Sequence, residues 1–129
     1  MQTAITQGIS VSVEVFYHAQ QSQPVNAQYV FAYRITIENQ SKHTVQLLRR
    51  HWHIFDTWRM NVREVEGAGV IGQQPILEPR QRHQYVSGCH LRSEMGWMHG
   101  TYLMQRLSDE QTFQVDIPTF KMIVPSKLN

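Results

Sequence analysis

The sequence contains one cysteine, Cys89, among its 129 residues. With a single thiol the chain can form no internal disulfide, which is typical of proteins from a reducing compartment. No apolar run approaches the roughly 20 residues that span a bilayer, and the first ten residues lack the basic and apolar segments of a signal peptide. We therefore predict a soluble, cytoplasmic protein that has no membrane partner.

The sequence also lacks a large excess of positive or negative charge. Twelve lysines and arginines stand against ten acidic residues, which gives a formal net charge of +2. Arg49 and Arg50 form an adjacent basic pair, and no longer basic run is present. This distribution lacks the clustered positive charge of a nucleic-acid surface, so we expect no nucleic-acid partner. At this length the chain is predicted to form a single domain over residues 1–129.

Helical periodicity is absent as well. No window of a dozen residues keeps apolar residues at the i, i+3, i+4 and i+7 spacing of an amphipathic helix. Alternation of apolar and polar residues dominates instead, as in "ISVSVEVFYH", and favours an all-β antiparallel sandwich of about seven or eight strands. The predicted strands lie within Ile9–His18, Gln28–Glu38, Thr44–Asp56, Val62–Glu66, Arg82–Cys89, Trp97–Arg106 and Thr112–Ile117, with a short tail strand at Phe120–Val124.

The same alternation predicts which side chains form the core. Trp52 lies in the middle of a strand and is expected to fill the space between two sheets. Cys89 is expected to be buried as a small apolar residue and not to act as a nucleophile. The other predicted core residues of the first three strands are Val11, Val13, Val15, Tyr17, Tyr29, Phe31, Tyr33, Ile35, Ile37, Leu48 and Ile54.

Three glycines, Gly67, Gly69 and Gly72, stand in the G-x-G-x-x-G spacing of a dinucleotide-binding loop. Such a loop must be followed by a helix whose N-terminus holds the pyrophosphate. Pro75 and Pro79 would interrupt a helix at this position, so the dinucleotide interpretation fails.

Two interpretations of the three glycines remain open. In the first, they serve a connection between strands, where glycine supplies positive φ or close backbone approach. In the second, successive backbone N–H groups form an anion-binding nest, to which Arg63, Arg80 and Arg82 lend charge from nearby in the sequence. We favour the turn, because glycine-rich turns are far commoner than phosphate cradles. The phosphate-binding alternative rests on the three glycines and Arg80.

His51 and His53 would project from the same face of one predicted strand, about 7 Å apart. Glu64 and Glu66 repeat this spacing on the next strand, and together the four residues sketch a zinc site of the His2Glu type. No further cysteine or histidine follows at ligand spacing, and the neighbouring Arg49 would repel a cation. We therefore expect a solvated face of the sheet, with no metal ion and no tight metal site.

Several blocks of the sequence, in this order, resemble one family. They are "YVFAYRITIENQS", "VQLLRRHW", "EVEGAGVIGQQPILEP", "YVSGC", "GTYLM" and "FQVDIPTF". In these motifs the chain is similar to the bacterial ApaG proteins from about Gly8 to Pro125. The resemblance implies a fibronectin type III-like or immunoglobulin-like sandwich. It also implies an association with cobalt and magnesium tolerance, which we expect to be indirect.

The resemblance transfers no catalytic residues to this sequence. The sequence also supplies no nucleophile, base and oxyanion group that could be assembled into an active site. Since related domains look like protein-binding modules, we predict a non-enzymatic module with an unidentified protein partner and no cofactor. The alternative is a binder or sensor of phosphate-rich ligands, such as pyrophosphate or nucleoside polyphosphates, that uses the Gly67–Gly72 loop.

Overall fold

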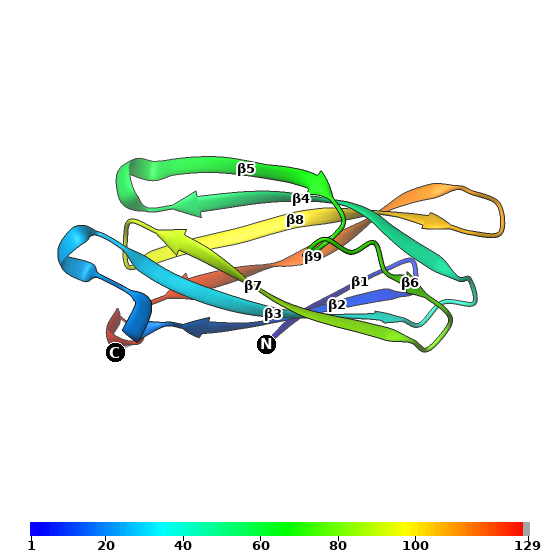
Figure 1. The fold of residues 1–129 in the computed structure, drawn as a ribbon, viewed down its shortest axis with the longest axis horizontal. Helices are drawn as coiled ribbons and strands as arrows, with labels where there is room; N and C mark the ends of the chain where they lie inside the picture. Colours follow the sequence, from blue (N-terminus) through cyan, green and yellow to red (C-terminus); the bar gives the residue numbers. More distant parts are fainter. Residues whose placement is uncertain (128–129) are drawn as a thin grey trace.

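Two antiparallel β-sheets form the protein, and most strands run along its long axis (Figure 1). The computed structural model describes residues 1–127. One sheet has the strand order β1-β2-β3-β7, and the other has the order β5-β4-β8-β9 with β6 also paired to β4. The strands are β1 Gln2–Thr6, β2 Ile9–Tyr17, β3 Tyr29–Asn39, β4 Val45–Asp56, β5 Asn61–Ala68, β6 Ile76–Leu77, β7 Arg82–Leu91, β8 Met95–Arg106 and β9 Thr112–Ile123.

The all-β prediction is confirmed. Over residues 1–127 the helical segments are four short 3₁₀ turns, at Ala19–Gln21, Pro24–Asn26, Trp58–Met60 and Pro125–Lys127. None of the helices in this part of the chain is long and apolar enough to cross a membrane. The two sheets have nine strands, against about seven or eight predicted.

Two strands were not predicted from the sequence because their alternation of apolar and polar residues is weak. Strand β1 is a mostly exposed edge strand with no buried residue, and β6 is only two residues long. The predicted strands Thr112–Ile117 and Phe120–Val124 are joined in the single strand β9. Here Pro118 lies at a register shift, since Met98 pairs with Phe120 but Gly100 pairs with Ile117. A bulge of this kind accommodates proline without the loss of a ladder hydrogen bond.

The predicted core is confirmed along β2 and β3, where alternate side chains face the other sheet. In β4 the prediction is wrong at one position, because Leu47 is buried and Leu48 is half-exposed. A register shift between Leu47 and Arg49 in the pairing with β8 moves the alternation by one residue. Beyond the shift, Trp52 is buried as expected.

An aromatic cluster joins the two sheets at the centre of the core. The Tyr33 ring lies 5.5 Å from both the Trp52 ring and the Phe120 ring, measured between centroids. Trp52 meets Phe120 edge to face at 5.9 Å. The Tyr85 and Tyr102 hydroxyls share a hydrogen bond, so the polar ends of these two rings are also satisfied. This cluster fixes the spacing of the sheets beside the cleft described below.

Candidate functional site

A cleft of about 510 Å³ opens between strands β5 and β7, each of which is the edge of its own sheet. Its wall and floor are largely aromatic and apolar, with Tyr33 and Tyr85 from one sheet and Trp52 and Met98 from the other. Burial raises the pKa of Tyr33 and of Tyr85, so both phenols stay neutral at physiological pH. The cleft is thus a concave, mainly uncharged surface of the size that takes a side chain or a small molecule.

Cys89 lies in the wall of the cleft, on β7. The thiol is buried, and burial raises its pKa to about 11. A thiol with this pKa is protonated at neutral pH and is therefore a poor nucleophile. The burial of Cys89 is thus as predicted, and its lack of nucleophilic reactivity stays a prediction.

Two arginines bring positive charge into the cleft. Arg63 of β5 reaches across to β7, where its Nη2 donates to the backbone oxygen of His90 at 2.6 Å. Arg50 of β4 donates through Nη1 to the backbone oxygens of Ala68 at 3.0 Å and Gly69 at 3.1 Å. Among the cleft residues in the described chain there is no carboxylate. The guanidinium groups therefore give this part of the cleft a positive charge.

Gly67 lies near the end of β5, and Gly69 and Gly72 lie in the turn that follows it. A side chain at Gly67 would come within 2.9 Å of the Arg50 guanidinium. Gly69 has φ +63°, and a Cβ there would lie 2.2 Å from the backbone oxygen of Gln73. Gly72 has φ +71° and no neighbour within 4 Å of an added Cβ. The geometry at Gly69 and Gly72 is that of a turn with positive φ, and close backbone approach occurs at Gly69.

Several backbone amides of this turn are already used within the protein. Gly69 donates to the Leu48 oxygen at 2.8 Å, and Val70 and Gln73 donate to one another's oxygens at 2.8 and 3.0 Å. These contacts leave fewer N–H groups for an anion than the nest hypothesis requires. Its other component, Arg80, has a backbone N–H that donates to the Asn39 oxygen at 2.7 Å. Arg80 is not among the residues that line the cleft in the described chain, whereas Gly72 is.

Of the cleft residues, the sequence indicated Arg63 as a charged neighbour of the glycines and Tyr33, Trp52 and Cys89 as core, but it did not indicate Arg50, Tyr85 or Ile71 as parts of a site. Arg50 and Trp52 are two residues apart on β4, so both side chains lie on its inward face. An arginine at a position that the alternation assigns to the core is unusual, and this could have pointed to a site. Tyr85 and Ile71 gave no such signal. They reach the cleft only because β7 and the β5–β6 connection meet there.

Ile71 is the most unusual residue at this site. It lines the cleft, its side chain is 61% exposed, and its φ is +47°. Positive φ is uncommon outside glycine, and a β-branched residue there is strained. The turn between Val70 and Gln73 thus keeps an exposed apolar side chain at an unfavourable backbone position.

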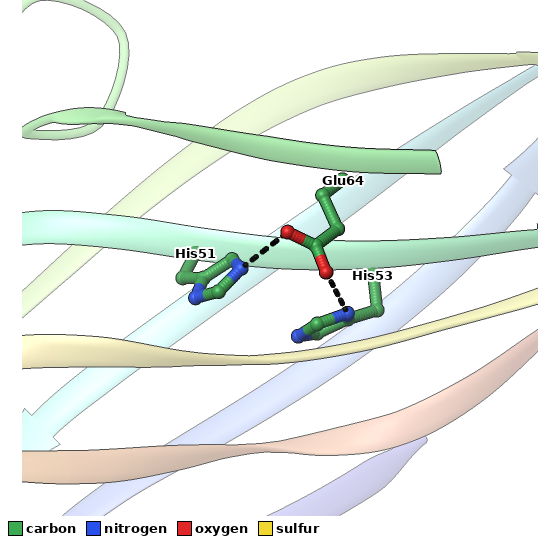
Figure 2. Close-up of side chains that lie close together, drawn as sticks. All are labelled: His51, His53 and Glu64. Atoms are coloured by element: carbon green, nitrogen blue, oxygen red, sulfur yellow. Dashed lines mark hydrogen bonds and ion pairs between the residues drawn. The ribbon is translucent and has the colours of Figure 1, made fainter. Parts of the chain in front are cut away.

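A second cluster lies on the opposite, outer face of β4, where His51 and His53 alternate with the buried Trp52 and Ile54. Glu64 on β5 extends between the two imidazole rings, with one carboxylate oxygen directed at each (Figure 2). The structure therefore brings together three of the four residues of the His2Glu sketch as one compact group. The fourth, Glu66, contacts the far side of the His51 ring at 3.1 Å.

Comparison with known proteins agrees with the sequence motifs. Residues 19–106 match the family model described as the ApaG domain. The chain is similar to Protein ApaG of Brucella canis, with 46% identity over 127 residues, or 98% of this chain and 96% of that protein. Protein ApaG of Brucella anthropi is 49% identical over the same shares. The crystal structure of a Bordetella pertussis protein has a TM-score of 0.87 and 42% identity, covering 91% of this chain and 94% of that one.

Proposed function

This chain belongs to the ApaG family, and we propose that it is a non-enzymatic module that binds an extended segment of a partner protein in the cleft between β5 and β7. The observation that carries the proposal is the strained, exposed Ile71 at the mouth of that cleft. A non-glycine residue at positive φ destabilises a protein by about 1–3 kcal/mol. An isoleucine that is 61% exposed recovers little of this cost through burial.

The backbone beside Ile71 is suited to an extended ligand. In the described chain, β5 pairs only with β4 and β7 pairs only with β3, so both strands present unpaired N–H and C=O groups along one edge. An extended peptide can add to such an edge as a further strand, with alternate side chains directed into a neighbouring pocket. An apolar side chain of the peptide would contact Val65 and Ile71.

The positive charge of the cleft further restricts the chemistry of the partner segment. The guanidinium groups of Arg50 and Arg63 lie in the cleft without an acidic lining residue in residues 1–127. We therefore expect the bound segment to combine an apolar side chain with an aspartate, a glutamate or a terminal carboxylate. Charge-assisted hydrogen bonds to arginine are about twice as strong as neutral ones, so this group would fix the register of the segment.

Replacing Ile71 with asparagine should separate binding from stability. Asparagine adopts positive φ more readily than isoleucine, so the variant should be as stable as the wild type or more stable by about 1 kcal/mol. The partner contact should nevertheless be lost. The measurement is a pull-down with quantitative mass spectrometry, together with a denaturant unfolding curve for each variant.

Val25→Asn is the matched control, because Val25 is 99% exposed and lies in the 3₁₀ turn Pro24–Asn26, outside the cleft. Wild type and Val25→Asn should retain one protein at stoichiometric amounts, and Ile71→Asn should not. Equal capture of that protein by all three chains would contradict the proposal, as would the absence of any enriched protein with the wild type.

The second candidate is a binder of phosphate-rich ligands, and the two cleft arginines are the observation that favours it. Isothermal titration with pyrophosphate at low and high salt tests this function. If pyrophosphate binds in the cleft, micromolar and salt-sensitive binding should disappear in Arg63→Gln and persist in Arg80→Ala. The reverse result would assign binding to the glycine nest with Arg80. Our first proposal predicts no such binding by the wild type.

A further inference from the structure

The outer face of β4 carries a set of side chains that the cleft does not use. Across the strands, His53 lies opposite both Glu64 of β5 and His99 of β8, and His51 lies opposite Glu66 of β5. Two of these pairs place an imidazole beside a carboxylate at the same height of the sheet. Cross-strand neighbours of this kind are close enough to share a ligand.

The distances match those of a metal centre. His51 Nε2 lies 3.4 Å from Glu64 Oε2, and His53 Nδ1 lies 3.5 Å from Glu64 Oε1 (Figure 2). One ligand atom from each of the three residues fits within a mutual separation of 4.8 Å. A tetrahedral ion with bonds of about 2.0–2.1 Å holds its ligand atoms roughly 3.3 Å apart. Only small side-chain adjustments would therefore be needed to place one ion among the three groups.

Outer contacts hold the two imidazoles in position. His51 Nδ1 lies 3.1 Å from Glu66 Oε1, so a proton on Nδ1 can be donated to that carboxylate and Nε2 keeps its lone pair. A carboxylate behind a ligating histidine is a usual feature of metal sites, where it fixes the tautomer and raises the basicity of the ring. His53 is stacked on His99, with centroids 4.8 Å apart and ring planes within 14°. The ring of His53 is therefore restrained from its far side.

From this arrangement we propose that His51, His53 and Glu64 bind one divalent transition-metal ion of the zinc or nickel type. Two nitrogens and one carboxylate oxygen suit such ions better than Mg²⁺, which prefers oxygen ligands. Three protein ligands leave a coordination position open to water or to a ligand. That position faces solvent, since Glu64 is exposed and the histidines are only half-buried.

The residue spacing led us to expect no tight metal site, but the fold adds contacts around the two histidines that the spacing does not reveal. No third histidine follows His51 and His53 at ligand spacing in the sequence, but β8 places His99 against the His53 ring. Arg49 was expected to repel a cation. In the structure it borders the same hollow as Glu66, which brings a carboxylate that is not a ligand to the same part of the surface. The second carboxylate also orients His51.

Zinc binding by the untagged protein tests the proposal, because a polyhistidine tag would itself bind the metal. We expect a competition titration against a chromophoric chelator to give one Zn²⁺ per chain, with a Kd in the micromolar range or tighter. His53→Ala and Glu64→Gln should each weaken binding at least tenfold, since each removes a ligand. Glu66→Ala should weaken it by about tenfold while the stoichiometry stays at one, as expected for a residue that orients a ligand.

His43→Ala is the matched control, because His43 is an exposed histidine in the β3–β4 connection and is not part of the cluster. It should bind zinc as the wild type does, and Mg²⁺ should give no binding to any variant. Unchanged far-UV circular dichroism would show that the substitutions left the fold intact. The proposal is overturned if wild type and a His51→Ala/His53→Ala double variant bind zinc equally, or if His43→Ala loses as much affinity as His53→Ala.

Discussion

Replacing Gly69 with alanine should lower the free energy of unfolding by about 2–4 kcal/mol. Gly69 has φ +63°, which strains any residue with a Cβ. The added methyl group would also meet the Gln73 backbone oxygen at 2.2 Å. That oxygen accepts the Val70 N–H at 2.8 Å, so it cannot withdraw without breaking the hydrogen bond that closes the turn. Urea unfolding followed by tryptophan fluorescence measures the loss, because Trp52 is buried.

Gly72→Ala is the matched comparison for this result. Its φ of +71° imposes a similar backbone strain, but within residues 1–127 no atom beyond its two chain neighbours lies within 4 Å of the added Cβ. Its cost should therefore be only about 1–2 kcal/mol. Equal costs for the two variants would mean that contact with Gln73 contributes nothing. A Gly69→Ala protein as stable as the wild type would show that these glycines serve something other than the turn.

Asn39→Asp should destabilise the protein by about 3–5 kcal/mol at neutral pH. Asn39 is fully buried at the end of β3. Its Nδ2 donates to the backbone oxygens of His43 at 2.7 Å and Leu77 at 2.9 Å, while its Oδ1 accepts from the Ser41 N–H at 2.9 Å. An ionised aspartate there has no proton to donate and would place its charge against two carbonyl oxygens. Thermal and urea unfolding both report the change.

The cost of Asn39→Asp should shrink as the pH falls toward about 4 and then level off, because burial raises the carboxyl pKa above its unfolded value and the protonated form can donate once. Asn26→Asp serves as the control, since Asn26 is exposed and its Nδ2 donates to the Gln23 side chain at 2.8 Å. That change should cost less than about 1 kcal/mol. A similar loss for both variants, or a loss at position 39 that is independent of pH, would contradict the argument.

The fold was predictable because one face of most long strands is buried. In β3, Phe31, Tyr33 and Ile35 alternate with half-exposed residues, and burial of one face forces this pattern on the sequence. Leu48 was misassigned because a bulge shifts the alternation and carries no sequence signal of its own. Strand β1 was missed for a related reason, since an exposed edge strand has little need of apolar residues.

The two candidate sites were predictable only in part, because each combines residues from distant strands. His51, His53 and Glu64 follow from spacing on neighbouring strands, but the stacking of His99 depends on the β4–β8 register. The cleft depends on two sheet edges lying side by side, which periodicity along a strand cannot reveal. Ile71 was hidden for another reason. Its role in the proposed site rests on a φ of +47°. The sequence of a glycine-rich turn does not indicate which of its other residues adopt positive φ.

The pairing of β3 with β7 and of β4 with β8 has a consequence for biosynthesis. Tyr29 lies opposite Leu91 and Val45 lies opposite Arg106, so each pairing joins segments up to about 60 residues apart in the chain, and at least about 40 apart at its other end. Non-local pairing of this kind makes folding slow, on a scale of milliseconds to seconds. During translation β2, β3 and β4 leave the ribosome well before the strands that cover them, with their apolar faces exposed. Chains that terminate before β8 should consequently aggregate, because no smaller part of the sandwich encloses a core.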